Sequence, residues 1–252
     1  MSAKHAHVDR RFLARGPLAA GETVVLSADE SHHLTRVLRL GPGDHVSVFD
    51  GRGHEFVAEV SAIERSAVSL RLLEPAQPAL EPSVPITIVQ AVLKGSSMDD
   101  VVRDATMIGA SSIVPVLTSR VAIKSSAAGA AATVDRWNRI ALASAKQSRR
   151  AVLPAVATPV PLADWMRSAD HDLRLILVEP TAGGGMTLRE LLQHRKPRSV
   201  AVIVGPEGGW SPEELAAARE HQCLAMSLGA LTLRADAVAA IAGSMVRLIW
   251  ED

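Results

Sequence analysis

The segment 199–215, SVAVIVGPEGGWSPEEL, passes from an apolar run through a glycine-rich turn into the start of a helix. The uninterrupted apolar residues 200–204 are typical of a buried strand. Ser211, Pro212, Glu213 and Glu214 form a capping box with proline at the first helical position. Strand, turn and helix in this order are the unit of α/β folds with a mostly parallel sheet.

The same alternation continues on both sides of this segment. Further apolar strands are expected at 85–93, 112–117, 173–180 and 223–229. Helices are expected from Ser96 or Ser97 to Ile108, from Thr133 to Arg149, from Thr187 to His194 and from Ala235 to Ile249. The small-residue stretch 124–133, KSSAAGAAAT, is interpreted as a flexible loop. Together these elements predict a mostly parallel sheet that is covered by helices on both faces.

The first part of the chain has a different pattern. Short strands bounded by Gly, Pro and Asp are expected at 22–27, 45–51, 54–63 and 67–73, with one helix from Ser27 or Asp29 to Leu38. Residues 74–85, EPAQPALEPSVP, hold four prolines and no glycine, which indicates a stiff linker. The sequence therefore predicts a compact β-barrel at 1–73, a linker at 74–85 and an α/β domain at 86–252.

Composition and missing motifs narrow the possible functions. The 252 residues are 48% hydrophobic, with 27 basic and 27 acidic residues, which excludes global disorder. The single cysteine, Cys223, excludes a disulfide framework, and no metal site is expected. Neither a signal peptide nor a membrane span is expected, so we expect a cytoplasmic protein. The common phosphate-loop, dinucleotide, zinc-protease and esterase motifs are also absent from the sequence.

Three turns are candidates for one ligand site. Besides the glycine turn 205–209, the stretch Ser227–Arg234 and the stretch Val178–Pro180 follow apolar strands. In parallel sheets ligands bind beyond the carboxyl ends of the strands. Backbone groups and small apolar side chains suit a neutral adenine, whereas a triphosphate would require lysines that these turns lack. The alternative is that the glycines only allow a tight connection.

Basic residues gather in the middle of the chain. Residues 119–150 contain seven Lys and Arg but one acid, Asp135. On the expected helix, Arg136, Arg139, Lys146 and Arg150 fall within one quadrant, which is typical of phosphate binding. With no Tyr and few other aromatic residues, recognition by phosphate and shape is favoured over base stacking. A solvated helix face is the alternative.

Four motifs then point to a known family. HHLTRVLRLGPGDHVSVFDGRG (32–53), QAVLKGSSMDDVV (90–102), GPEGGWSPEEL (205–215) and SLGALTLRADAVAA (227–240) occur in this order. Together they resemble the RsmE family of 16S ribosomal RNA uridine-N3 methyltransferases in the SPOUT superfamily. The resemblance implies a PUA-like β-barrel for RNA, an α/β domain with a deep trefoil knot, S-adenosylmethionine as methyl donor and a homodimer. Two alternatives stay open: a SPOUT methyltransferase that acts on another RNA, and a non-catalytic RNA-binding protein.

The resemblance also assigns roles to residues. Arg234 is the expected catalytic cation and Glu207 the expected proton acceptor, with Asp236 as an alternative acceptor. The residues expected to bind the cofactor are Val178, Glu179, Gly205, Pro206, Gly208, Gly209, Ser227, Leu228, Gly229, Leu233 and Ala235. The residues expected to bind 16S ribosomal RNA are Arg36, Arg39, Lys94, Arg120, Arg136, Arg139, Gln147, Arg149 and Arg150.

The sequence departs from the family pattern at a few positions. Residues 233–238 read LRADAV where the family resembles L-R-x-E-T-A. Asp104 and Met107 stand where Lys and Glu are usual, and Lys146 replaces an acid. The altered residues that follow Arg234 belong to the expected site, whereas the sequences of the turns themselves agree with the family pattern.

Overall fold

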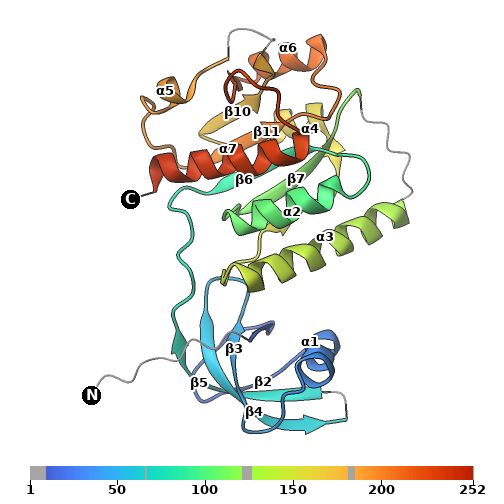
Figure 1. Cartoon of the computed structure of the whole chain (residues 1–252), viewed down its shortest axis with the longest axis vertical. Coiled ribbons are helices and arrows are strands. Elements are labelled where there is room, and N and C mark those ends of the chain that lie inside the picture. Colours follow the sequence, from blue (N-terminus) through green and yellow to red (C-terminus); the bar gives the residue numbers. More distant parts are fainter. Residues whose placement is uncertain (1–9, 66, 121–126, 181–184, 252) are drawn as a thin grey trace. The chain divides into compact units, whose positions relative to one another are not determined.

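The computed structural model describes residues 10–65, 67–120, 127–180 and 185–251 (Figure 1). By its contacts the chain divides into two compact units. Residues 1–80 together with 145–153 form unit 1, and residues 81–144 together with 154–252 form unit 2. The short segment 145–153 therefore joins a unit that is otherwise made from the beginning of the chain.

Unit 1 is built on a five-stranded sheet. Its strands lie in the order β1 (Arg11–Leu13), β3 (His45–Phe49), β4 (Glu55–Glu64), β5 (Ala67–Ala76) and β2 (Thr23–Val25). The pairings are antiparallel except for β1 with β3. Strand β1 was not expected, because three residues are too few to show a periodic pattern. The other four strands lie within or close to the predicted ranges.

One helical segment packs against this sheet. Helix α1 (Ala28–His32) continues as the π-helical turn η1 (His33–Val37), and the Ser27 hydroxyl accepts a hydrogen bond from the Glu30 amide. Of the two predicted caps, Ser27 is the one used. The core of the unit includes Phe12, Leu34 and Val48, all fully buried.

Strand β5 extends into the stretch that was expected to be a linker. Glu74 and Pro75 pair with Val57 and Phe56 on β4. Strand β2 covers only residues 69–71 of β5, so Pro75 lies where β5 has a single paired neighbour. Proline is tolerated at such an edge because no partner needs its missing N–H group.

Unit 2 contains a parallel sheet. Its strands are β6 (Ile86–Ala91), β7 (Ser112–Leu117), β8 (Ala155–Val156), β9 (Val160–Pro161), β10 (Leu173–Leu177), β11 (Val200–Val204) and β12 (Leu224–Met226). They lie in the order β12-β10-β11-β6-β7-β8, with β9 also paired to β7, and every pairing is parallel. The predicted parallel sheet is confirmed, while the short strands β8 and β9 were not expected.

Helices cover both faces of this sheet, as predicted. The helices of unit 2 are α2 (Ser97–Met107), α3 (Ala127–Gln147, whose last three residues join unit 1), α4 (Leu162–Ser168), α5 (Leu188–Leu191), α6 (Pro212–Glu220) and α7 (Ala235–Trp250). Alternate residues of β11 face opposite ways. Val200, Val202 and Val204 pack into a core with residues of α2, α3 and α7, whereas Ala201 and Ile203 pack into a second core with residues of α4 and α6.

Helix α3 differs from its prediction at both ends. Residues 127–133 are helical rather than loop, since alanine, which dominates this stretch, has the highest helix propensity. Residues 124–126 of the expected loop lie outside the described residues. The helix ends at Gln147 instead of Arg149, and Arg149 has a positive φ of 62°, which a helix interior does not allow.

The trefoil knot stays a prediction, because strand order alone does not test it. Among the described residues, no helix is both long and apolar enough to cross a membrane.

Candidate active site

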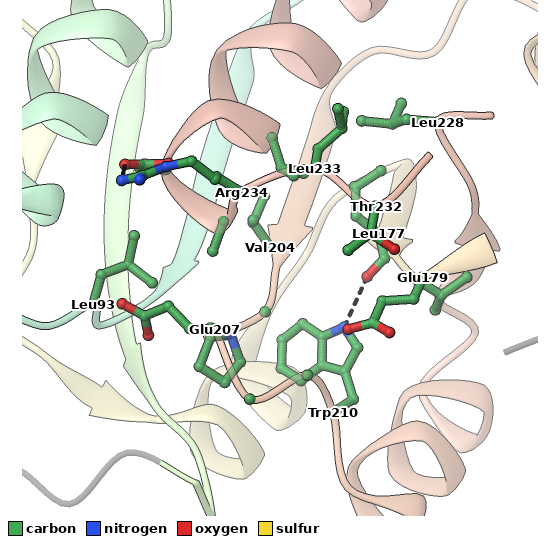
Figure 2. A pocket seen from close by; sticks show the side chains of 18 of the residues that line it. Leu93, Leu177, Glu179, Val204, Glu207, Trp210, Leu228, Thr232, Leu233 and Arg234 are labelled. Atoms are coloured by element: carbon green, nitrogen blue, oxygen red, sulfur yellow. Dashed lines mark hydrogen bonds and ion pairs between the residues drawn. The ribbon is translucent and has the colours of Figure 1, made fainter. Parts of the chain in front are cut away.

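A cavity of about 610 Å³ lies at the carboxyl ends of the parallel strands of unit 2. Its wall combines residues 177–180 at the end of β10, residues 204–210 at the end of β11, and Leu228, residues 231–236 and Val238 after β12. Leu93 and Ser97 after β6 and Arg120 after β7 complete it. The three turns singled out in the sequence therefore converge on one cavity (Figure 2).

The glycine turn 205–209 is held by hydrogen bonds from neighbouring strands. Gln90, fully buried on β6, donates from Nε2 to the carbonyl of Gly205 at 3.3 Å. Arg120 donates to the carbonyl of Gly208. Trp210 donates from Nε1 to the carbonyl of Leu177, at the end of β10, at 2.8 Å. A turn fixed from three strand ends presents its remaining backbone groups in a defined geometry.

Glycine is required here for two different reasons. A Cβ atom on Gly205 would lie 3.0 Å from Cε2 of Trp210, so a larger residue would push against the indole. Gly209 has a φ of 67°, a conformation that side chains disfavour, and a Cβ there would lie 3.3 Å from Oε1 of Glu179. The glycines thus allow Trp210 and Glu179 to approach the backbone closely.

The middle of the cavity is apolar. Leu177, Val204, Leu228 and Leu233 contribute side chains to it, and Figure 2 shows Val204, Leu233 and Leu177 between Arg234 and Glu207 on one side and Glu179 on the other. An apolar wall beside backbone N–H and C=O groups suits a neutral planar heterocycle such as adenine. The prediction made from the turns is thus consistent with the shape of the wall.

Arg234 and Glu207 lie at one side of this cavity, and Glu179 lies at the other (Figure 2). Arg234 donates from Nε and from one terminal nitrogen to Asp236, at 3.1 and 2.6 Å, while its side chain stays 81% exposed. The hydrogen bond to Asp236 raises the pKa of Arg234, and the charge of Glu207 adds to this effect. The cation is therefore permanent and accessible.

The two acids next to Arg234 differ in how they are engaged. The hydrogen bond from Arg234 lowers the pKa of Asp236, so this carboxylate is a weak proton acceptor. Glu207 is exposed, and the backbone N–H of Lys94 donates to its Oε1 at 3.3 Å. Glu207 is therefore the better placed of the two predicted proton acceptors.

The structure brings most predicted cofactor residues to the wall of the cavity, together with Arg234 and Glu207. The exceptions are Ser227 and Gly229, which are absent from the wall; instead the Ser227 hydroxyl donates to the carbonyl of Gly229 at 3.1 Å. Their expected contact with the cofactor is not supported by this geometry.

Several wall residues were missed from the sequence. They are Leu93, Ser97, Leu177, Val204, Trp210, Leu215 and Val238, whereas Pro180, Leu231 and Thr232 belong to the predicted turns without having been assigned a role. Leu177, Val204 and Trp210 had a usable signal, because they end a strand or directly follow the glycine turn. The others come from separate parts of the chain, and only the fold places them here.

The basic stripe predicted on α3 is wrong as a continuous surface. Arg150 lies beyond the helix and is only 4% exposed. Arg136 pairs with Asp99, and Lys146 pairs with Glu30 at 2.6 Å. Arg120 lines the cavity of unit 2. The other residues expected to bind RNA are exposed, namely Arg36, Arg39, Lys94, Arg139, Gln147 and Arg149.

Two departures from the family pattern have local partners. Lys146 is bonded to both carboxylate oxygens of Glu30, and Asp104 pairs with Arg103 at 2.8 Å. Both substitutions are therefore compensated within their own unit. Among the described residues, no group of three or more His, Cys, Asp or Glu is placed to hold a metal ion.

Comparisons with known proteins agree with this geometry. Residues 80–247 match a model described as an RNA methyltransferase domain, and residues 26–73 match one described as an RNA methyltransferase PUA domain. The chain is 31% identical to the ribosomal RNA small subunit methyltransferase E of Synechocystis sp., over 91% of this chain and 74% of that protein. It is 26% identical to the Rickettsia conorii protein of the same name, over 95% of each chain.

Two solved structures with a bound cofactor are similar as well. A methyltransferase from Legionella pneumophila, in complex with SAM, has a TM-score of 0.88 at 30% identity and covers 96% of this chain and 98% of that one. The ribosomal RNA small subunit methyltransferase E from Neisseria gonorrhoeae, bound to S-adenosylmethionine, has a TM-score of 0.86 at 27% identity, over 97% and 98% of the two chains.

Proposed function

Because this chain belongs to the RsmE family of ribosomal RNA small subunit methyltransferases, we propose that it methylates N3 of one uridine in 16S ribosomal RNA with S-adenosylmethionine as donor. The observation that carries the proposal is the convergence of three strand-end turns on one cavity of about 610 Å³. Its site of action is then the cytoplasm, where small ribosomal subunits are found.

The residues of the cavity fit the proposed cofactor. Its apolar side chains and the backbone of the turn at Gly205, Gly208 and Gly209 suit an adenosyl group, as the wall holds few cations for a phosphate. Polar groups at the two sides, Glu179 and Arg234, can face the hydroxyl and charged parts of such a molecule. When bound, S-adenosylmethionine supplies a methyl group carried on a positively charged sulfur.

The main contribution of the protein is alignment. A uridine in folded RNA must leave its stack before N3 is accessible, at a cost of a few kcal/mol. Holding the uridine and the donor in line contributes roughly 7–11 kcal/mol to the lowering of the barrier. The hydrogen bonds that fix the glycine turn from β6, β7 and β10 supply the rigidity that such alignment needs.

Arg234 is the residue that we assign to charge stabilisation. When N3 loses its proton, negative charge spreads to the neighbouring carbonyl oxygens of the base. A fixed cation beside those oxygens favours this ionised form. The bond to Asp236 holds the guanidinium in place at the wall of the cavity, and the 81% exposed side chain keeps N–H groups that do not bond Asp236.

Glu207 is the residue that we assign to proton removal, directly or through a water molecule. It lines the cavity on the same side as Arg234, and its second carboxylate oxygen accepts no hydrogen bond from the described residues (Figure 2). A general base must be within hydrogen-bond reach of the proton that it accepts. Glu207 meets this requirement better than Asp236, because both carboxylate oxygens of Asp236 already accept hydrogen bonds from Arg234.

Unit 1 is proposed to bind the ribosomal RNA. Residues 26–73 of this unit match the PUA domain that accompanies RNA methyltransferase domains, and Arg36 and Arg39 are exposed on it. Exposed cations bind phosphates and release counterions, which gives affinity without sequence specificity. We therefore assign general RNA binding to these arginines.

We also propose that the enzyme is a homodimer. Helix α7 exposes Ile241 (39%) and Leu248 (72%), one heptad apart on one face, and Leu231 is 78% exposed in the turn after β12. Exposed apolar side chains along one helix face favour a partner surface. Light scattering should give twice the mass of the chain for the wild type, and a smaller mass for Leu248→Asp.

The experiment that tests the proposed activity uses small ribosomal subunits from a strain that lacks the gene. Purified protein and methyl-labelled S-adenosylmethionine are added, and the nucleosides are then identified by mass spectrometry. We expect labelled 3-methyluridine. Label in a different nucleoside would move the activity to another RNA atom, and cofactor binding without any transfer would favour a non-catalytic protein.

A further inference from the structure

Gln90 is a buried polar residue whose hydrogen bonding is incomplete. It lies on β6, between β11 and β7 in the sheet of unit 2, and is 0% exposed. Its Oε1 atom is buried and has no hydrogen-bond partner among the described residues. A buried polar atom without a partner costs stability, and an apolar side chain of the same size would avoid that cost. The stability of the sheet therefore does not explain a glutamine at this position.

The orientation of the Gln90 amide follows from its neighbours. Nε2 donates to the carbonyl of Ala91 at 3.0 Å and to that of Gly205 at 3.3 Å. Carbonyl oxygens only accept hydrogen bonds, and Nε2 is the only donor of the side chain. Turning the amide over would place Oε1 against both carbonyls and lose both bonds. The unpartnered Oε1 is therefore a consequence of the bonds that Nε2 makes.

Gln90 lies beside the wall of the cavity of unit 2 without being part of it. In the register of the sheet it is opposite Val204 on β11, so the two side chains point to the same face. Val204 lines the cavity (Figure 2), whereas Gln90 does not. Gln90 can therefore act on a ligand only through a neighbour, and the wall residue that its side chain bonds is Gly205.

Gly205 is the flexible joint between β11 and the rest of the glycine turn. Residues 206–209 form a closed turn, in which the N–H of Gly209 donates to the carbonyl of Pro206 at 3.0 Å. Glycine restricts rotation about its own backbone bonds least of all residues. Because Pro206 has no N–H, the Gly205 carbonyl is the only hydrogen-bonding group of the peptide that joins these two residues. The bond from Gln90 therefore acts on the only polar atom through which this peptide can be held.

The other two side chains that fix the turn act at different points. Arg120 donates to the carbonyl of Gly208, and the Trp210 indole donates to the end of β10. The indole lies against Gly205 but does not bond its carbonyl. Without Gln90 this carbonyl could rotate toward the cavity, whose wall includes Gly205, and bond water there. The joint would then have more than one conformation.

We propose that Gln90 is a positioning residue for S-adenosylmethionine, which acts by holding the carbonyl of Gly205 on the side of the buried amide. The turn then presents the backbone of residues 206–209 to the adenosyl group in one conformation before the cofactor binds. A preorganised site binds more tightly because less ordering is required on binding. The inference rests on the proposed function for the identity of the ligand, and it does not depend on which nucleotide is methylated.

The test compares Gln90→Met with the wild type by calorimetry with S-adenosylhomocysteine and by urea denaturation. Methionine has a similar length but no hydrogen-bond donor. We expect Kd to rise about fivefold, as for the loss of one hydrogen bond. The midpoint of urea denaturation should stay unchanged, because the variant also removes the unpartnered Oε1. An unchanged Kd would contradict the proposal, and a higher Kd with a lower midpoint would show that Gln90 only stabilises the fold.

A second variant, Gln90→Glu, separates the hydrogen bond from the packing. Burial disfavours the charged form of a carboxyl group, and a neutral carboxyl group has an O–H that can donate to the Gly205 carbonyl. We therefore expect Gln90→Glu to bind S-adenosylhomocysteine more tightly than Gln90→Met at mildly acidic pH. Equal Kd values for the two variants would show that the bond to Gly205 has no effect on binding.

The matched control is Thr118→Val. Thr118 follows β7, is 8% exposed, and its Oγ1 is also buried without a hydrogen-bond partner among the described residues. This variant should leave Kd unchanged, and a rise equal to that of Gln90→Met would overturn the proposal. None of these measurements requires methyl transfer. A wild type that does not bind S-adenosylhomocysteine would refute the proposed function, whereas normal binding by both the wild type and Gln90→Met would refute only the role of Gln90.

Discussion

Two arginine–carboxylate pairs in this molecule have opposite surroundings. In unit 1, Arg11 and Glu55 are 5% and 6% exposed and lie 2.8 Å apart, with every N–H of the arginine engaged. In unit 2, Arg234 is 81% exposed and bonds only Asp236 among the described residues. One pair lies inside the sheet unit and the other lies at the wall of the methyl-transfer cavity.

The comparison separates a structural role from a catalytic one. A saturated, buried pair has no N–H left for a substrate, and removing one partner leaves the other charged and buried. An exposed pair has little effect on stability but keeps donors that a substrate in the cavity can reach. Burial and unused donors, rather than residue type, therefore indicate which arginine acts on the substrate.

The largest expected effect is on the buried pair. Arg11→Ala should lower the free energy of unfolding by about 3–5 kcal/mol, because Glu55 and three backbone carbonyls lose their partner. Urea denaturation followed by circular dichroism measures this. The double variant Arg11→Met/Glu55→Leu should recover much of the loss, since it leaves no unpaired charge. A single variant as stable as the wild type would show that the pair has no structural role.

The second prediction concerns the exposed pair. Arg234→Ala should reduce kcat by about 10²–10³-fold, as expected when one group that stabilises developing charge is removed. Urea denaturation should show stability within about 0.5 kcal/mol of the wild type, and calorimetry should show unchanged cofactor affinity. The control is Arg247→Ala. It removes the ion pair between Arg247 on α7 and Glu251 just beyond the helix, and it should leave kcat unchanged. Normal turnover of the Arg234 variant would show that Arg234 has no catalytic role.

A smaller effect is expected at the hydrogen bond that fixes the glycine turn. Trp210→Phe keeps an aromatic ring beside Gly205 but leaves the carbonyl of Leu177 without its donor. Loss of one such bond costs about 1 kcal/mol, so cofactor affinity should fall about fivefold. Calorimetry with S-adenosylmethionine measures this. An unchanged affinity would mean that the turn keeps its shape without the tryptophan.

The smallest expected effect is on the pH dependence of stability, and it comes from the partly buried side chain of His171. Burial lowers the pKa of His171 from its usual 6.5, while its Nε2 lies 3.0 Å from the Thr87 hydroxyl. The unfolded chain then binds a proton more readily than the folded one, so stability is lost as the pH falls through 6.5 toward the lower pKa of the folded state. In His171→Gln this part of the pH dependence should disappear from denaturation curves. Parallel curves for the two proteins would contradict it.

The sequence predicted the parts of the fold that rest on local patterns. Apolar strands such as 200–204, the capping box at Ser211 and the three turns were identifiable because periodicity and turn chemistry act over a few residues. Strand β1 and the strands of residues 155–161 were missed because they are too short to show a period. The loop assigned to 124–133 was wrong in its helical part, since small size was taken for flexibility although alanine favours helix.

The site shows the same division. The turns and Arg234 were found because each has its own motif, whereas Leu93, Ser97 and Leu215 are placed at the cavity only by the fold. The basic stripe failed at Arg150 because helical phase was extended past the true end at Gln147. Buried partners such as Glu30 for Lys146 are 116 positions apart in sequence and leave no local signal.

The most direct test is a crystal structure of the protein grown with S-adenosylhomocysteine. We predict the ligand between residues 177–180, 205–210 and 228–235, with its sulfur toward the side that holds Arg234 and Glu207. Ligand bound elsewhere on the chain, or a cavity filled by its own side chains, would contradict the proposed methyl-donor site.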